Sequence, residues 1–115
     1  VQFPAVKAAA YAKLHQRASH YAIAGVAAAL EASGGTIAAA RVGLTGAASH
    51  AMRLTAVEQA LVGKPLSDAT IDAAAAVAGD GVGEVNADLH ASAEYRRAMI
   101  PVFTRRALQA ARARA

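Results

Sequence analysis

The sequence contains no cysteine and no tryptophan, and its aromatic residues are limited to two Phe and three Tyr. Without cysteine the chain has no disulfide, thiol nucleophile or thiolate ligand for zinc or iron–sulfur clusters, and it fits a cytoplasmic protein. No strongly apolar stretch of about 18 residues is free of glycine and charge, so we expect no membrane span. Hydrophobic residues make up 56% of the chain, but most are alanine, which predicts a core that buries little area per residue.

The length of 115 residues gives room for one domain, and we treat residues 1–115 as a single unit. The chain begins at Val1, with neither an initiator methionine nor a signal-peptide pattern. This start suggests a processed, proteolysed or excised piece. The net charge is +4, and the excess of positive charge lies toward the C-terminus.

The first half of the chain is rich in alanine, and its residues favour two different structures. Alanine propensity predicts a helix over residues 5–16 and favours helix again over residues 22–40. However, Gly34-Gly35 separates two similar apolar runs that contain β-branched residues, a pattern typical of a hairpin. In the hairpin alternative, the strands and a third strand or extended piece would span about Tyr21–Ala32, Thr36–Ala47 and Ala48–Arg53.

The middle of the chain carries the signals of a short helix. Thr55 and Glu58 have the spacing of a capping box, which predicts a helix over about Ala56–Val62. Gly63 stands where a left-handed cap ends a helix, and Pro65 prevents its continuation.

A second short helix is predicted immediately afterwards. Ser67 is a good N-cap residue, and Asp68 is favourable at the positive end of the helix. The helix would run to about Ala78. The glycines that follow predict a loop over residues 79–90.

The last helix is predicted from near Ser92 to the C-terminus, and it carries half of the twelve Lys and Arg residues. Its apolar residues recur at three- and four-residue spacing, which predicts a core-facing stripe of Tyr95, Met99, Val102 and Phe103. Pro101 lacks an amide hydrogen and should bend or loosen the helix. The more polar side would carry Arg96, Arg97 and Arg105, and Glu58 is a candidate ion-pair partner of Arg96 or Arg97.

The sequence carries no recognisable catalytic or metal-binding motif. The glycines at Gly34-Gly35 and in residues 79–83 match neither a dinucleotide-binding fingerprint nor a P-loop. The four histidines lack the spacing of a metal site, and the carboxylates show no pairing typical of acid–base catalysis. We therefore expect no catalysis and no metal site in this domain.

Two basic groups are candidates for binding. Lys13, Arg17 and His20 precede the expected first strand, and they form either a binding cluster or a solvated helix face. The C-terminal arginines would suit nucleic acid, but no aromatic residues lie among them. We favour a subunit contact, or a solvated tail that complements the helix dipole, for Arg105, Arg106, Arg112 and Arg114.

Four segments occur in the order found in one known family. They are Tyr11-x-Lys13-Leu14-x-x-Arg17-x-x-x-Tyr21-Ala22, Gly34-Gly35 followed by Ala40-Arg41-Val42-Gly43-Leu44-Thr45-Gly46-Ala47-Ala48, Glu58-Gln59-Ala60-Leu61-Val62-Gly63 and Ser92-Ala93-Glu94-Tyr95-Arg96-Arg97. Together they resemble the C-terminal domain of the FAD-binding (medium) subunit of molybdenum hydroxylases, the carbon monoxide and xanthine dehydrogenase type. The resemblance covers about Tyr11–Arg112. His20, where the family usually has an acidic residue, and Pro101 depart from the pattern.

The resemblance implies an α+β fold in which a small antiparallel sheet, the hairpin plus a third strand, packs with about three helices. In the family this domain follows two FAD-binding domains, which are absent from this chain. The parent enzyme, an oxidoreductase, passes electrons from a molybdenum cofactor through iron–sulfur clusters to FAD.

The resemblance also implies roles for particular residues. Lys13, Arg17 and His20 would lie near the outer edge of the flavin as cofactor-binding residues. The rest of the domain would be scaffold and would contact the FAD-binding domains and the molybdenum and iron–sulfur subunits. FAD itself would not bind tightly to this domain alone.

Two other functions fit the residues. One is a free-standing interaction or dimerisation module with the same fold. The other is a small basic helical protein that binds nucleic acid. A helix over residues 22–40 would favour the nucleic-acid-binding protein and exclude the flavoprotein domain.

Overall fold

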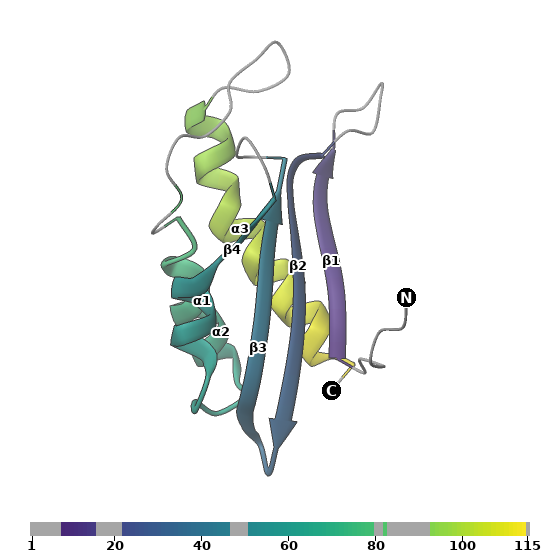
Figure 1. The fold of residues 1–115 in the computed structure, drawn as a ribbon, viewed down its shortest axis with the longest axis vertical. Coiled ribbons are helices and arrows are strands. Elements are labelled where there is room, and N and C mark those ends of the chain that lie inside the picture. Colours follow the sequence, from purple (N-terminus) through teal and green to yellow (C-terminus); the bar gives the residue numbers. More distant parts are fainter. Residues whose placement is uncertain (1–7, 16–21, 47–50, 80–81, 83–92, 115) are drawn as a thin grey trace.

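Strands precede helices along the chain (Figure 1). The computed structural model describes residues 8–15, 22–46, 51–79, 82 and 93–114. The elements are β1 (Ala8–His15), β2 (Ala22–Ser33), β3 (Thr36–Thr45), β4 (Met52–Arg53), α1 (Thr55–Leu61), α2 (Asp68–Ala76) and α3 (Ala93–Arg112). The strands form one antiparallel sheet in the order β1-β2-β3-β4, which confirms the predicted α+β fold.

The β2–β3 hairpin forms as predicted from Gly34-Gly35. Ser33 pairs with Thr36 across the turn, and the two glycines have φ values of 60° and 80°. Two successive positive φ angles are typical of a tight hairpin turn whose twist matches the flanking strands, and glycine adopts them without steric cost. The helical alternative for residues 22–40 is therefore wrong.

Strand β1 replaces the helix that alanine propensity predicted over residues 5–16. It pairs along its length with β2, with Ala8 opposite Leu30 and Tyr11 opposite Ala27. Ala8 and Ala10 are buried in the core, whereas Tyr11 is exposed. Strand pairing and this alternation outweigh the helix propensity of alanine, which is a weak preference compared with tertiary packing.

The extended piece that follows the hairpin is short. Met52 and Arg53 form β4, opposite Leu44 and Gly43 of β3. The earlier part of the predicted piece, residues 48–50, lies outside the described residues. Because β1 adds an edge strand, the sheet is wider than the predicted hairpin plus third strand.

Helix α1 begins at Thr55, follows the N-cap residue Leu54 and has no side-chain hydrogen bond at its cap. The predicted capping box is therefore wrong, and the Glu58 carboxylate bonds to strand β3 instead. Beyond the helix, Gly63 has a φ of 81°, as predicted for a left-handed cap. Its amide donates to the carbonyl of Ile37 at 2.8 Å, which ties the end of α1 to β3.

Helix α2 begins where Ser67 predicted it. The Ser67 hydroxyl accepts a hydrogen bond from the Thr70 amide at 3.4 Å, which satisfies one of the unpaired donors of the first turn. The helix ends at Ala76, two residues before the predicted end. The predicted loop beyond it falls mostly outside the described residues.

Helix α3 turns to the core a face that only partly matches the predicted stripe, in which Met99 does pack against the core. Phe103 is buried, but Tyr95 and Val102 are 46% and 37% exposed. Arg96, expected on the polar side, is only 4% exposed. The buried residues of the helix are Arg96, Ile100, Phe103, Thr104, Ala107, Leu108 and Ala111. The helix continues through Pro101 without ending there.

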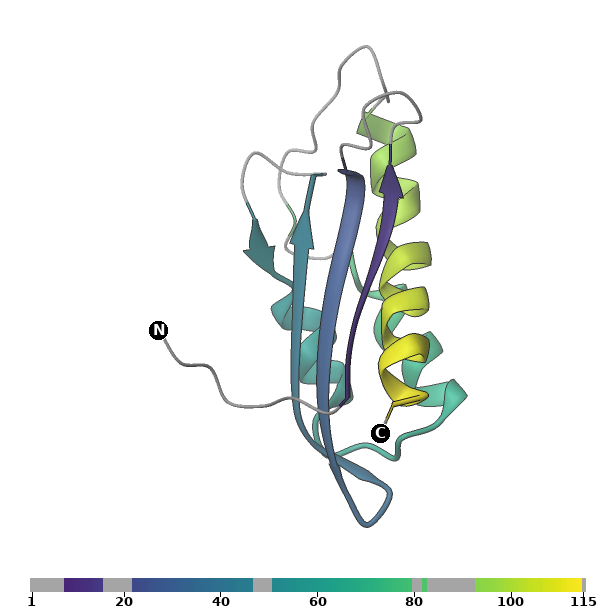
Figure 2. The same cartoon turned by 90° about the vertical axis from the view of Figure 1, so that its right-hand side faces the viewer.

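Helices α2 and α3 lie on one side of the sheet, as Figure 2 shows, whereas α1 lies beside the edge formed by β3 (Figure 1). α3 packs on β1 and β2, α1 packs on β3, and α2 packs against both other helices. The core between sheet and helices contains Val26, Ile37, Leu44, Ile71 and Leu108, each at most 1% exposed. No described element packs on the opposite side of the sheet.

Candidate functional site on the open face of the sheet

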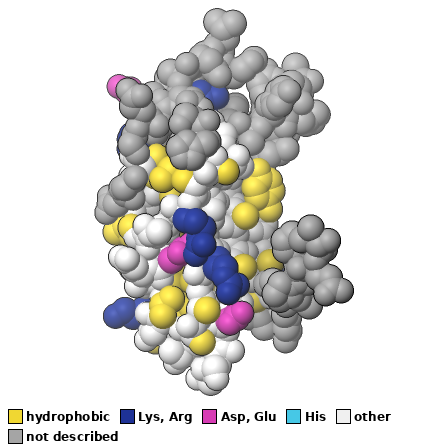
Figure 3. All heavy atoms as spheres, viewed as in Figure 1, with side chains coloured by type: hydrophobic (Ala, Val, Ile, Leu, Met, Phe, Trp, Pro, Cys, Tyr) yellow, Lys and Arg dark blue, Asp and Glu magenta, His cyan; other side chains and the backbone are white. Residues whose placement is uncertain are grey.

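The side of the sheet that faces away from the helices is made mainly of small residues. This surface, called the open face, comprises Ala9, Tyr11, Gly25, Ala27, Ala29, Glu31, Arg41, Gly43 and Arg53. Successive side chains of a strand point to opposite faces, so the intervening residues, such as Val26 and Val42, enter the core. Figure 3 views the open face and shows basic side chains over the middle of the sheet, next to acidic ones.

Tyr11 stands out from this flat surface. Its side chain is 52% exposed, and its ring lies over Gly25, because a Cβ added at Gly25 would come within 2.2 Å of the Tyr11 hydroxyl oxygen. Glycine at this position therefore gives the ring room to lie across β2. Two shallow hollows of about 510 and 400 Å³ adjoin the ring, and both are lined by Ala27, Gly43 and Arg53.

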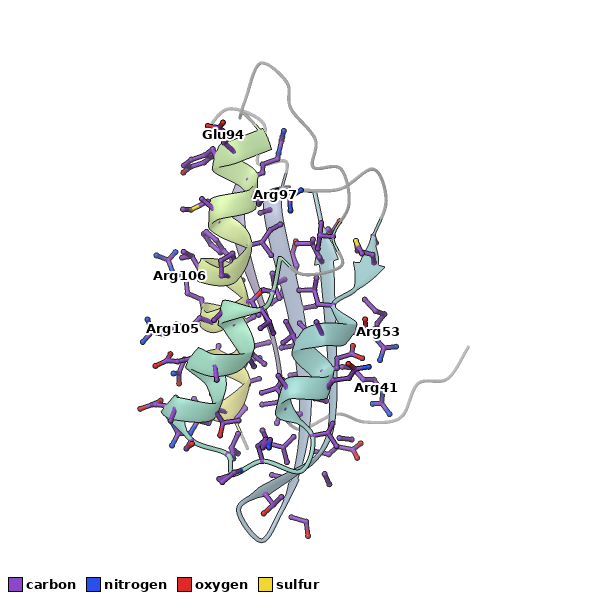
Figure 4. All side chains as sticks on the ribbon, turned by 90° about the vertical axis from the view of Figure 1, so that its left-hand side faces the viewer. Arg41, Arg53, Glu94, Arg97, Arg105 and Arg106 are labelled. Carbon is purple, nitrogen blue, oxygen red and sulfur yellow. The ribbon has the colours of Figure 1, made fainter. Side chains whose placement is uncertain are left out.

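The two arginines of the open face point away from α3 (Figure 4). Nε and Nη2 of Arg53 donate to the two carboxylate oxygens of Glu58, at 2.5 and 2.9 Å. The backbone amide of Val42 donates to Glu58 Oε2 at 2.8 Å. The Glu58 carboxylate thereby joins β3, β4 and α1.

The electrostatics of this contact favour a charged Glu58. Partial burial alone would raise the pKa of Glu58, whose side chain is 12% exposed. Hydrogen bonds from Arg53 and from the Val42 amide, together with the positive charges of Arg53 and Arg41, outweigh burial and hold the pKa of Glu58 below its ordinary 4.5. The hydrogen bond to Glu58 raises the pKa of Arg53. Among the described residues, no carboxylate bonds to Arg41.

Of the three predicted cofactor-binding residues, only Lys13 lies in a described element, near the end of β1. The backbone of Lys13 pairs with Gly25, so it lies next to the open face. Arg17 and His20 fall outside the described residues, and the three side chains are therefore not brought together by any described contact. Their role stays a prediction.

The chain matches the CO dehydrogenase flavoprotein C-terminal domain over residues 9–111. It belongs to this family. The carbon monoxide dehydrogenase medium chain of Afipia carboxidovorans is 37% identical to it over 106 residues, which cover 92% of this chain and 36% of that protein. The chain thus spans little more than a third of the length of this curated relative.

Solved structures show the same similarity in three dimensions. A Cu,Mo-containing CO dehydrogenase superposes with a TM-score of 0.83 at 36% identity, over 93% of this chain and 37% of the other. Quinoline 2-oxidoreductase from Pseudomonas putida 86 superposes with a TM-score of 0.85 at 29% identity, over 96% and 38%. The fold of this flavoprotein C-terminal domain therefore recurs in a CO dehydrogenase and in a quinoline 2-oxidoreductase.

The helical side of the flavoprotein domain uses several of its arginines in contacts within the fold. Arg105 pairs with Asp72 at 2.7 Å, and Arg112 pairs with Asp68 at 2.6 Å. Both aspartates belong to α2, so these ion pairs link α2 to α3. The expected pairing of Glu58 with Arg96 or Arg97 does not form, since Glu58 bonds to Arg53. The nucleic-acid-binding alternative depended on a helix over residues 22–40 and on the C-terminal arginines. Residues 22–33 and 36–45 form strands instead, and Arg105 and Arg112 are used in ion pairs within the fold.

The described part of the flavoprotein domain has no candidate metal site and no candidate membrane-spanning helix. Within it, no group of three His, Asp or Glu residues could hold a metal ion. No helix described in the structure is long and apolar enough to cross a membrane.

Sequence reasoning did not select Tyr11, Arg41 or Arg53 as site residues. Tyr11 was placed in a helix, where its exposure on a sheet could not be anticipated. The alternation of apolar Val42 and Leu44 with Arg41 and Gly43 was the available signal for an arginine on the open face.

Proposed function

We propose that this domain is a non-catalytic scaffold in the flavoprotein subunit of a molybdenum hydroxylase, where it supports electron transfer from iron–sulfur clusters to FAD. The family match over residues 9–111 carries the proposal. The alternative of a free-standing interaction module has no comparable support. A cytoplasmic location is part of the proposal, and it agrees with the absence of cysteine.

FAD would be held by parts of the subunit that this chain does not contain. A dinucleotide site needs a glycine-rich turn between a strand and a helix, where amides meet the pyrophosphate. The described residues form no such turn, because the Gly34-Gly35 turn joins two strands. The hollows beside Tyr11 are shallow and lie on a flat sheet. The described residues therefore do not fit a complete FAD site.

Lys13, Arg17 and His20 are proposed to lie beside the flavin's outer edge, as the family resemblance implies. Cationic side chains at positions 13 and 17 would stabilise negative charge on the reduced ring. The location of Lys13 on the edge strand β1 is compatible with contact to a neighbouring domain. The FAD-binding domains of the subunit and the molybdenum and iron–sulfur subunits are the proposed partners.

Binding of FAD to the purified chain tests the scaffold assignment. We expect no tight quenching of flavin fluorescence when the chain is added to FAD. A dissociation constant in the micromolar range would show a complete site within these residues and would overturn the assignment.

The proposed basic residues are tested in the assembled flavoprotein. Lys13→Gln combined with Arg17→Gln is expected to lower the reduction potential of the bound FAD, because less positive charge would stabilise the reduced ring. Lys64→Gln is the matched control, since Lys64 is exposed in the turn after α1. Equal potentials in all three proteins would remove Lys13 and Arg17 from the flavin's surroundings.

A further inference from the structure

We infer that the open face is the docking surface for the FAD-carrying part that precedes this domain in the flavoprotein subunit. The inference rests on the proposed function and identifies the contact through which the scaffold would act. The partner's surface would be apolar and closely packed against the centre of the open face, and it would present a carboxylate to Arg41.

The composition of the open face is the first reason. An antiparallel sheet with one solvated side usually alternates apolar residues toward the core with polar residues toward water. Here four of the outward positions, on three neighbouring strands, are Ala9, Ala27, Ala29 and Gly43. Residues this small leave a flat, weakly polar surface that allows another backbone to approach closely.

The exposed ring of Tyr11 is the second reason. Tyrosine is enriched in protein interfaces and among the residues that dominate their binding energy, because it combines a large apolar surface with a polar tip. The ring lies on top of small residues of the open face, is exposed, and borders a hollow on the sheet. A partner side chain can fill this hollow and bury the ring.

Charge indicates the chemistry of the partner. The charge of Arg53 is matched by Glu58 within the domain, whereas Arg41 is exposed and bonds to no carboxylate among the described residues. A carboxylate on the partner's surface would meet Arg41 beside the small residues of the open face. Such complementarity favours correct orientation and rapid association.

The order of the parts along the polypeptide indicates which partner covers the open face. The chain covers 36% of the medium chain of Afipia carboxidovorans and matches a C-terminal domain, so most of that relative precedes the matching region. The preceding polypeptide reaches the sheet at Ala8, where edge strand β1 begins, beside Ala9 of the open face. A tether of this kind gives an effective concentration of about millimolar, which favours the attached part over a second copy.

The absence of cysteine allows a direct labelling experiment. Ala27→Cys places one thiol on the open face, and Ala73→Cys places one on the exposed side of α2. Each variant is treated with a maleimide, first alone and then mixed with the FAD-loaded remainder of the Afipia carboxidovorans medium chain. Circular dichroism verifies that both variants keep the fold. We expect the complex to slow labelling of Ala27→Cys at least tenfold and to leave that of Ala73→Cys unchanged.

A charge reversal supplies a second measurement. Arg41→Glu is expected to weaken association with the same FAD-loaded polypeptide about tenfold, as for loss of a close charge pair. Lys64→Glu makes the same change of charge outside the open face and is expected to have little effect.

The outcomes separate the two proposals. If no complex forms, the proposed function fails. If a complex forms but protects Ala73→Cys rather than Ala27→Cys, the inference alone fails. Slow labelling of Ala27→Cys in the isolated chain, together with a dimer in sedimentation, would assign the open face to a second copy and would also overturn the inference.

Discussion

The Glu58 carboxylate accepts a hydrogen bond from the backbone amide of Val42, 2.8 Å away, and so connects helix α1 to strand β3. The same carboxylate bonds twice to Arg53 of β4. A residue whose spacing from Thr55 suggested a local helix cap therefore serves as a link between elements. This link holds the edge of the sheet that carries both arginines of the open face.

Loss of this link should lower stability. Glu58→Ala is expected to reduce the free energy of unfolding by about 1–3 kcal/mol, because it leaves the Val42 amide without its acceptor. Glu58→Gln should cost less, since its carbonyl oxygen can still accept from Val42. Urea denaturation measures both changes. Glu31→Ala, at an exposed position of β2, is the control, and a loss as large as that of Glu58→Ala would contradict this explanation.

The lowered pKa of Glu58 predicts a dependence of stability on pH. A carboxyl whose pKa is lower in the folded state stabilises the protein above its unfolded pKa, and this contribution disappears as pH falls through the folded pKa. The wild-type advantage over Glu58→Gln should therefore be full at neutral pH and shrink once the pH drops below about 4.5. Urea denaturation at pH 7 and pH 3 measures this difference in the free energy of unfolding between the wild type and Glu58→Gln. An advantage that grows on acidification would show that the shift has the opposite sign.

The caps of the two short helices can be distinguished by two equivalent substitutions. Ser67→Ala should lower the free energy of unfolding by about 0.5–2 kcal/mol, because the Thr70 amide loses its acceptor. Thr55→Ala should have a much smaller effect, since Thr55 is within α1 and makes no cap hydrogen bond. Thermal unfolding followed by circular dichroism compares them. Equal losses of stability would show that Thr55 does cap α1, which contradicts the structure.

Left-handed glycines provide a test of the turns. Gly63→Ala is expected to cost about 1–2 kcal/mol, because Gly63 has a φ of 81° and a Cβ is disfavoured in this region. Gly79→Ala is the matched control, since Gly79 has no positive φ and an added Cβ would meet nothing within 4 Å. Denaturant titration of both variants is the measurement. An unchanged midpoint for Gly63→Ala would contradict the role of this residue in ending α1.

Local signals predicted the parts of the fold whose cause is local. Gly34-Gly35 identified the hairpin because two positive φ angles need glycine, and Ser67 marked the start of α2 because a cap needs one side chain and one nearby amide. Strand β1 had no such signal. Its alanines favour helix in isolation, and they form a strand because β2 supplies hydrogen-bond partners and α3 covers one side.

The candidate site was harder to predict than the fold for the same reason. Glu58 was assigned to a cap because Thr55 is near in sequence, whereas its actual partners Val42 and Arg53 meet it only after the sheet has formed. The open face depends on which side of the sheet the helices cover, and no short pattern specifies that side. The family resemblance supplied the fold but selected Lys13, Arg17 and His20, not Tyr11 or Arg41.

Helix α3 shows how tertiary contact chooses between two apolar stripes, and it supports a final prediction. Ile100 is fully buried, whereas Val102, two positions along, is 37% exposed. Ile100→Ala should lower the free energy of unfolding by about 2–5 kcal/mol, because it removes core contacts and leaves a cavity. Val102→Ala should cost far less than this. Urea denaturation of both variants measures the difference, and a larger loss for Val102→Ala would mean that α3 is rotated toward the stripe predicted from the sequence.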